Sequence, residues 1–129
     1  MGGGASGLCC LVSLVDQLKA SPPPRALTVR LFEKRLKTVG AGLPYQLDQS
    51  RSNIMNDSIN YISVKGYGEP DHFMRWLAAE KPRWGKLFPE IAQGFDLDKI
   101  NPGATFLPRI VVGMYLDDTY QSCLKAIAN

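Results

Sequence analysis

Apolar residues recur every three or four positions along several separate stretches of this chain, and that spacing predicts amphipathic helices. The first stretch covers residues 7–20, and Ser21-Pro22-Pro23-Pro24 ends it because proline has no amide hydrogen to donate. The second covers 25–39, with an apolar face opposite a basic one, and Gly40-Ala41-Gly42 ends it. The N-terminal third therefore predicts two helices separated by a proline linker.

The rest of the chain predicts three more helices. They cover 70–81, 89–93 and 107–128, and each begins at or close to a proline, which suits the first turn of a helix. Between the last two, Asn101-Pro102-Gly103 predicts a tight turn. The buried stripe of the final helix is expected to comprise Val112, Leu116, Tyr120, Cys123 and Ile127.

Residues 45–65 fit two structures. Their apolar spacing favours a helix, whereas 61–64 equally fit a short strand. The sequence therefore predicts a mainly α fold, a small bundle of about five short helices with an extended N-terminal arm and, as an alternative, minor β structure around 60–65. Residues 1–24 are expected to form a flexible arm with its helix and proline linker, and 25–129 a single helical domain.

Composition narrows the class of protein. The 129 residues are 45% hydrophobic and carry a formal net charge of +3, which is enough apolar material for a core and only mildly basic. Three cysteines, two of them adjacent, suggest no disulfide framework and favour a reducing compartment. Neither a signal peptide nor a run of roughly 20 apolar residues is present, so any membrane attachment is expected to be peripheral.

The first ten residues match a lipid-attachment pattern. Met-Gly followed by Ser6 fits the N-myristoylation signal, in which Gly2 accepts the lipid. Cys9 and Cys10 are candidates for a second, reversible lipid, which stable anchoring requires. The structural alternative is an N-terminal tail that happens to begin Met-Gly, with two cysteines that pack as small hydrophobic residues.

Basic residues gather in the segment that follows. A helix over 25–39 would present a cationic surface that attracts anionic lipid headgroups. Trp84, between two prolines, is expected to be an exposed ring that anchors at the interface. The alternative is an ordinary solvated helix face. The candidate membrane- or anion-binding residues are Arg30, Lys34, Arg35, Lys37 and Trp84.

The opening of the chain resembles that of the retroviral matrix proteins. The resemblance rests on Gly2, Ala5, Ser6 and Leu8 together with the basic tendency of the following segment. It implies a lipid on Gly2 and a basic surface that faces the inner leaflet of a membrane.

No catalytic, cofactor or metal site is predicted. His72 is the only histidine, and no spacing brings Cys9, Cys10 or Cys123 to it as a nucleophile. The cysteines and histidine lack the spacing of a zinc site. No phosphate-binding glycine loop is expected, because Gly2 to Gly4 precede no predicted strand.

These observations favour a non-enzymatic peripheral membrane protein with a matrix-like or adaptor role on the cytoplasmic face of a membrane. Its expected partners are an anionic membrane surface and either a protein partner or further copies of itself. Two alternatives stay open, an accessory structural subunit ordered within a large complex and a nucleic-acid-binding module.

Overall fold

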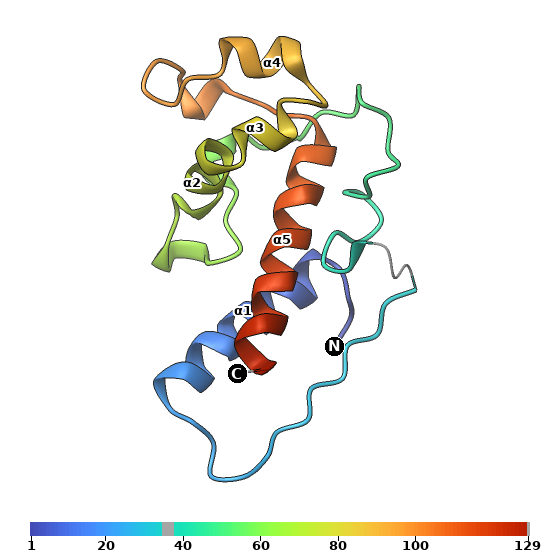
Figure 1. Cartoon of the computed structure of the whole chain (residues 1–129), viewed down its shortest axis with the longest axis vertical. Helices are drawn as coiled ribbons and strands as arrows, with labels where there is room; N and C mark the ends of the chain where they lie inside the picture. The colour runs from blue at the N-terminus through green and yellow to red at the C-terminus, as the bar shows by residue number, and fades with distance from the viewer. Residues whose placement is uncertain (35–37, 129) are drawn as a thin grey trace.

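The C-terminal helix α5 (Arg109–Ala128) runs through the middle of the molecule, and the other elements pack around it (Figure 1). The computed structural model describes residues 1–34 and 38–128. Helix α1 (Ala5–Ala20) crosses one end of α5. Helices α2 (His72–Ala79), α3 (Lys81–Trp84) and α4 (Pro89–Gly94) lie towards the other end. The fold is thus built on contacts between α5 and both halves of the chain.

Three short 3₁₀ turns complete the described part of the chain. They are η2 (Ile59–Tyr61), η3 (Gly66–Gly68) and η4 (Pro102–Ala104). In η4 the side chain of Asn101 accepts a hydrogen bond from the amide of Gly103, as expected of the predicted turn. No strand is assigned within residues 1–34 and 38–128, so the predicted fold class, mainly α with about five helices, is confirmed.

Helix α1 follows directly from the apolar spacing of its sequence. Its inward face is buried against the core and comprises Leu8, Leu11, Val12 and Val15. Burial of each such side chain contributes about 1.5–3 kcal/mol, which explains how a helix that starts in a glycine-rich segment is held. The domain boundary predicted after residue 24 stays a prediction, although this helix shares its core with α5.

The helix predicted over 25–39 is wrong in its described part. Residues 25–34 are extended, and Phe32 forms a parallel bridge with Gly2. The amide of Gly3 donates to the carbonyl of Phe32 at 2.8 Å, and the amide of Phe32 donates to the carbonyl of Met1 at 3.0 Å. These backbone bonds, in a segment that contains Thr28, Val29 and Phe32, override the helical spacing. Residues 38 and 39 lie in a turn, and 35–37 lie outside the described residues.

The helix favoured over 45–65 is also wrong. This segment consists of turns with a single 3₁₀ turn, η2, and its backbone is bonded to the loop that leads into α5. The amide of Met55 donates to the carbonyl of Leu107, and that of Ile59 to Thr105, both at 3.0 Å. Residues 61–64 do not form a strand either. The four Asn and Asp residues at 53–60 have poor helix propensity. The hydrogen bonds to Leu107 and Thr105 therefore determine the conformation of this segment.

The later helices agree with their predictions in place and differ in detail. The stretch 70–81 divides into α2 and α3 near Pro82, while α4 and α5 begin beside Pro89 and Pro108. Within the predicted stripe of α5, Val112, Leu116 and Cys123 are buried, Tyr120 is half-buried and Ile127 is exposed.

Trp84 requires a correction. We predict it from the sequence as an exposed anchor, yet its side chain is 0% exposed. Its indole Nε1 donates to the carbonyl of Leu77 at 2.9 Å, and the ring meets Phe95 edge-on at 5.2 Å between centroids. Because α3 turns directly against α2, the ring points into the core instead of into solvent. Trp84 therefore stabilises the fold and offers no ring to a membrane.

Candidate functional site

The glycines that lead into α1 form a tightly packed loop. Gly2, Gly4 and Gly7 are spaced G-x-G-x-x-G, and the loop connects the extended residues 1–3 with the first turn of α1. A Cβ atom at Gly7 would approach the carbonyl oxygen of Gly2 well inside the separation that real Cβ atoms keep. Only glycine at this position lets the helix pack so closely against the preceding backbone.

The end of the second extended segment brings a carboxylate to this loop. Glu33 directly follows Phe32, the residue that bridges Gly2. A Cβ atom at Gly3 would lie only 2.5 Å from the Cβ of Glu33 and 2.7 Å from its Oε2. The glutamate therefore lies against the loop, at the carboxyl end of the paired segments.

The start of α1 offers amide donors to a ligand. The first hydrogen bond within the helix joins the amide of Leu8 to the carbonyl of Gly4, so the amides of residues 5–7 have no partner inside the helix. Gly4 caps the helix without a side chain, and no acidic residue lies in the first turn. The partial positive charge of the helix N-terminus, about half an elementary charge, is thus directed at whatever lies before it.

A second glycine segment forms the opposite wall. Gly40 has φ +93° and donates its amide to the carbonyl of Gly3 at 2.7 Å, while Gly42 has φ +58° and lies beside Gly4. Both backbone conformations favour glycine. Between the two glycine segments is a pocket of about 450 Å³. Its lining residues are Gly2, Gly4, Ala5, Ser6, Gly7, Ala41, Gly42, Pro44 and Tyr45.

The arrangement has the features of a site for a dinucleotide. Amides at a helix N-terminus bind phosphate oxygens, and a glycine loop lets the pyrophosphate approach the backbone closely. Glu33 follows the second extended segment and lies against Gly3, beside the pocket but not among its lining residues, and an acidic residue after that segment can accept hydrogen bonds from a ribose. A pocket of this volume is within the range of small-molecule sites. The residues present therefore fit an adenine dinucleotide.

A second polar cluster lies apart from this loop, where α2 meets α5. The Nδ1 of His72 is 2.7 Å from the hydroxyl of Tyr115, which accepts a hydrogen bond from the amide of Val64 at 3.1 Å. We assign the phenol proton to the contact with Nδ1, and this assignment places the proton of the neutral imidazole on Nε2. Burial lowers the pKa of His72 and raises the pKa of Tyr115 to about 12.

This cluster predicts a pH dependence. Since the pKa of His72 is below 6.5 in the folded chain, the unfolded chain binds more protons just below that pH. The stability associated with His72 is complete above pH 6.5 and declines as the pH falls towards the pKa of His72 in the folded chain.

NMR titration of this single histidine should give a midpoint below 6.5. Tyr115→Phe should raise that midpoint, because the donor to the neutral ring is lost, whereas Tyr61→Phe, on an exposed ring, should not. An unchanged midpoint in Tyr115→Phe would contradict the assigned hydrogen bond.

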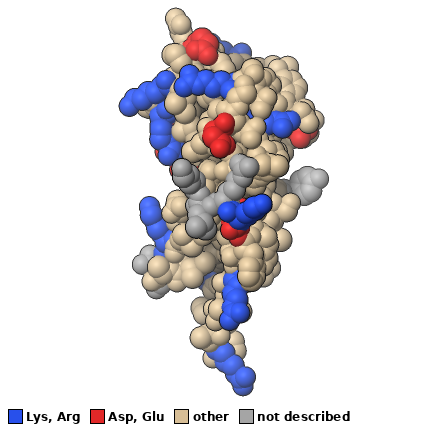
Figure 2. Space-filling model, turned by 90° about the vertical axis from the view of Figure 1, so that its right-hand side faces the viewer, with Lys and Arg blue, Asp and Glu red and all other residues tan. Residues whose placement is uncertain are grey.

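The structure disperses the residues predicted to bind membranes or anions. Arg30 and Lys34 lie on an extended segment and share no helix face, so the predicted basic helical surface is wrong there. Arg35 and Lys37 lie outside the described residues. On the face seen in Figure 2, basic side chains are scattered from one end of the molecule to the other instead of forming one patch.

The predicted lipid-attachment residues all lie on or near the glycine loop. Gly2 lines the pocket described above, Cys9 is half-buried on α1, and Cys10 is exposed. Burial raises the pKa of the Cys9 thiol, which makes it a weaker nucleophile at neutral pH. Their acylation stays a prediction.

Within the described residues, no helix is both long and apolar enough to span a bilayer, and no group of three or more His, Cys, Asp or Glu could hold a metal ion.

Comparison with known families finds one match that covers the whole chain. The model of a family described as FAD-NAD(P)-binding matches residues 1–129. Neither the curated proteins nor the solved structures gave a match to the chain. The family match points to a flavin- or nucleotide-binding role of the oxidoreductase type. It overturns the predicted non-enzymatic membrane adaptor and the two alternatives beside it, an accessory subunit and a nucleic-acid-binding module.

Sequence reasoning set the glycine loop aside because no strand was recognised beside it. Two signals in the sequence could have found it. One is the full spacing of Gly2, Gly4 and Gly7 before a predicted helix, and the other is the mainly apolar run 26–32 followed by Glu33. The run was predicted as a helix, so its partnership with residues 1–3 went unseen.

Proposed function

The chain belongs to the FAD-NAD(P)-binding family, and we propose that its glycine loop, residues 2–7, binds the pyrophosphate of an adenine dinucleotide. The observation that carries this proposal is the position of Glu33 against Gly3, at the N-terminal end of α1. A phosphate-binding loop alone would suit many anions. The added carboxylate is suited to a ribose hydroxyl and narrows the ligand to a nucleotide.

In this proposal each part of the site has its own task. The amides of residues 5–7 donate hydrogen bonds to phosphate oxygens, and the helix dipole favours the negative charge. Gly2 and Gly4 keep the approach to the backbone free of side chains. The segment around Gly42 and Tyr45 forms the other side of the pocket.

The chemistry proposed for the bound group is redox chemistry. A nicotinamide or flavin supplies hydride or electron transfer when it is bound. The residues described here bind and orient the adenylate half of such a cofactor. They therefore support an oxidoreductase-type role through cofactor placement.

Glu33 also favours one class of dinucleotide. Its carboxylate accepts a hydrogen bond from a free ribose 2′-hydroxyl but repels a 2′-phosphate. We therefore expect FAD and NADH to bind more tightly than NADPH.

Calorimetric titration of the full chain with FAD, NADH and NADPH tests the proposal. Glu33→Gln should weaken the binding of FAD or NADH by about tenfold, the effect of replacing a hydrogen bond to a charged group by one to a neutral group. The same variant should reduce the ratio of the NADH affinity to the NADPH affinity, since the repulsion between the carboxylate and the 2′-phosphate is removed. Glu90→Gln, on the exposed surface of α4, is the matched control and should bind like the unmodified chain. The proposal would be refuted if none of the three dinucleotides bound, or if Glu33→Gln bound FAD and NADH as tightly as the unmodified chain does.

The peripheral location at the cytoplasmic face of a membrane stays a separate prediction that rests on Gly2, Cys9 and Cys10. Gly2 belongs to the proposed nucleotide pocket, and the amino group of Met1 donates to the carbonyl of Arg30 at 3.0 Å. Acylation of Gly2 after removal of Met1 would therefore alter the proposed site itself.

A further inference from the structure

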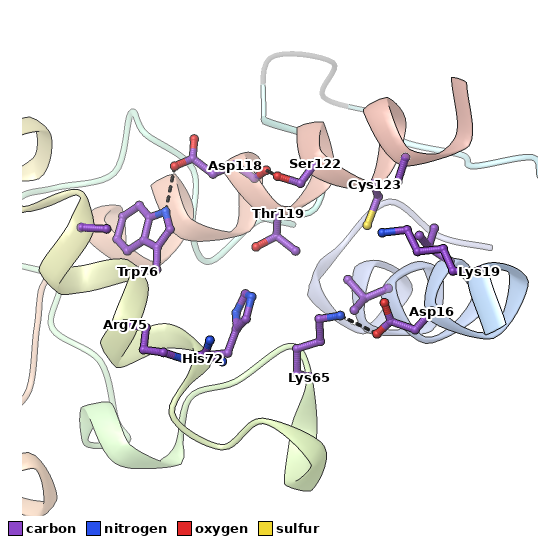
Figure 3. A pocket seen from close by; sticks show the side chains of 14 residues that line it. Asp16, Lys19, Lys65, His72, Arg75, Trp76, Asp118, Thr119, Ser122 and Cys123 are labelled. Atoms are coloured by element: carbon purple, nitrogen blue, oxygen red, sulfur yellow. Dashed lines mark hydrogen bonds and ion pairs between the residues drawn. The ribbon is translucent and has the colours of Figure 1, made fainter. Parts of the chain in front are cut away.

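A second pocket lies between α1, α2 and α5, away from the glycine loop. Its volume is about 340 Å³ (Figure 3). The residues of α1 that line it begin at Val12 and continue to Lys19, so it borders the C-terminal half of this helix, whereas the glycine loop precedes its first turn. The pocket is therefore a separate site, and nothing in the proposed binding of a dinucleotide uses it.

One part of the pocket wall is apolar. Val12 and Val15 come from α1, Ala79 from α2 and Ala126 from α5. Both valines are nearly completely buried, so they form a floor with little exposed surface. A ligand with a compact hydrocarbon body or a single ring suits such a wall, because binding would remove the apolar surface of the ligand from water.

Two lysines line the same pocket. Figure 3 shows Lys19 extending from α1 towards Cys123, and Lys65 extending from the segment before η3 towards Asp16. Both ammonium groups act to lower the pKa of this buried thiol, although burial, the larger effect, raises it. Lys65 is paired with Asp16 and lies 3.9 Å from Glu69, whereas Lys19 forms no ion pair within 4.0 Å among the described residues. The charge of Lys19 is thus left over for a ligand at this end.

His72 supplies a directed donor beside them. Its ring projects between α2 and α5 towards Thr119 (Figure 3). With the phenol proton of Tyr115 assigned to Nδ1, the N–H of the ring is on Nε2, and His72 is one of the residues that line the pocket. Three of the side chains that line the pocket are basic, Lys19, Lys65 and Arg75, and two are acidic, Asp16 and Asp118. Asp118 is already bonded to Trp76 and Arg83, and Arg75 to Glu69 and Asp71.

We propose that this pocket binds a small monocarboxylic acid with an apolar body. Its carboxylate lies between Lys19, Lys65 and the Nε2–H of His72, and its hydrocarbon part rests on Val12 and Val15. A neutral ligand of the same shape would leave the cationic end unused. A dianion is disfavoured because Asp16 already offsets one of the two lysines.

NMR titration of the full chain with benzoate, and in parallel with the neutral benzamide, tests this proposal. The single histidine and the two tryptophans act as built-in reporters. Trp76 lines the pocket, whereas Trp84 is buried against Leu77 and Phe95 and serves as the internal control. At constant ionic strength, benzoate in the millimolar range should shift the signals of His72 and Trp76 saturably and leave Trp84 in place.

Lysine variants complete the test. Lys19→Met should weaken the binding of benzoate by about tenfold, because one hydrogen bond to a charged group is lost. Lys125→Met, an exposed change on α5 outside the pocket, should not weaken it. An unshifted Trp84 indole signal in each variant shows that the fold is kept. Lys19→Met is expected to keep it, because Lys19 forms no ion pair that the substitution could break. Shifts that do not saturate, equal shifts with benzamide, or unchanged affinity in Lys19→Met would each overturn the proposal. Because no dinucleotide takes part, its outcome is independent of the proposed function.

Discussion

Replacement of Trp84 by alanine is expected to lower the free energy of unfolding by about 3–5 kcal/mol. The side chain is completely buried, its ring packs edge-on against Phe95, and its Nε1 satisfies the carbonyl of Leu77. The substitution therefore leaves a cavity and an unpaired carbonyl together. Urea denaturation, with the slope compared between variants, measures the loss.

Tyr61→Ala is the matched control for this experiment. Tyr61 is 77% exposed, so removal of its ring should change the free energy of unfolding by no more than about 0.5 kcal/mol. A comparably small effect of Trp84→Ala would mean that Trp84 is a surface residue, as the sequence alone suggests. The comparison thus decides between the buried position in the structure and the exposed anchor predicted from the flanking prolines.

The helices that sequence could predict are those with a long and unambiguous apolar stripe. In α1 the residues at helical spacing are also the residues that the core buries, and a proline run follows the helix. Local spacing and tertiary packing agree there, so the local pattern suffices. In α5 the position of the helix after Pro108 is predicted correctly, but the core buries every residue from 110 to 116, and Tyr120 is half-buried and Ile127 exposed, so the buried surface differs from the predicted stripe.

The segment 25–34 shows why other elements could not be predicted. Val29 and Phe32 fit a helical stripe, but the conformation is decided by hydrogen bonds to residues 1–3, about thirty positions away in the sequence. Such a bond is invisible to any local pattern. Since Glu33 reaches the loop only through this pairing, the error in secondary structure also removed the second half of the candidate site.

The loop itself satisfied two patterns at once. Acylation requires Gly2 and Ser6, whereas dinucleotide binding requires Gly2, Gly4 and Gly7. The two interpretations differ at Gly4 and Gly7, which the acylation pattern leaves free. The structure gives Gly7 a strict steric role against the carbonyl of Gly2, and this role separates the interpretations physically.

Gly7→Ala is accordingly expected to abolish dinucleotide binding. The new Cβ cannot be accommodated beside the oxygen of Gly2, so the first turn of α1 must move away from the loop. Loss of two amide hydrogen bonds to a charged phosphate corresponds to a dissociation constant raised by at least about a hundredfold. Calorimetric titration with FAD and NADH measures this change, and urea denaturation should show a simultaneous loss of about 1–3 kcal/mol from overpacking.

Two further glycine variants separate binding from folding. Gly94→Ala, at the end of α4, has open space around the new Cβ and should affect neither property. Gly2→Ala also has open space in the fold, but Gly2 lines the pocket, so this variant should keep its stability and lose affinity. If Gly7→Ala bound dinucleotides as tightly as Gly94→Ala does, the close approach of α1 to the loop would serve only the packing of the helix. Weaker binding in Gly2→Ala at unchanged stability would instead locate the ligand on the loop, because no change in folding could account for it.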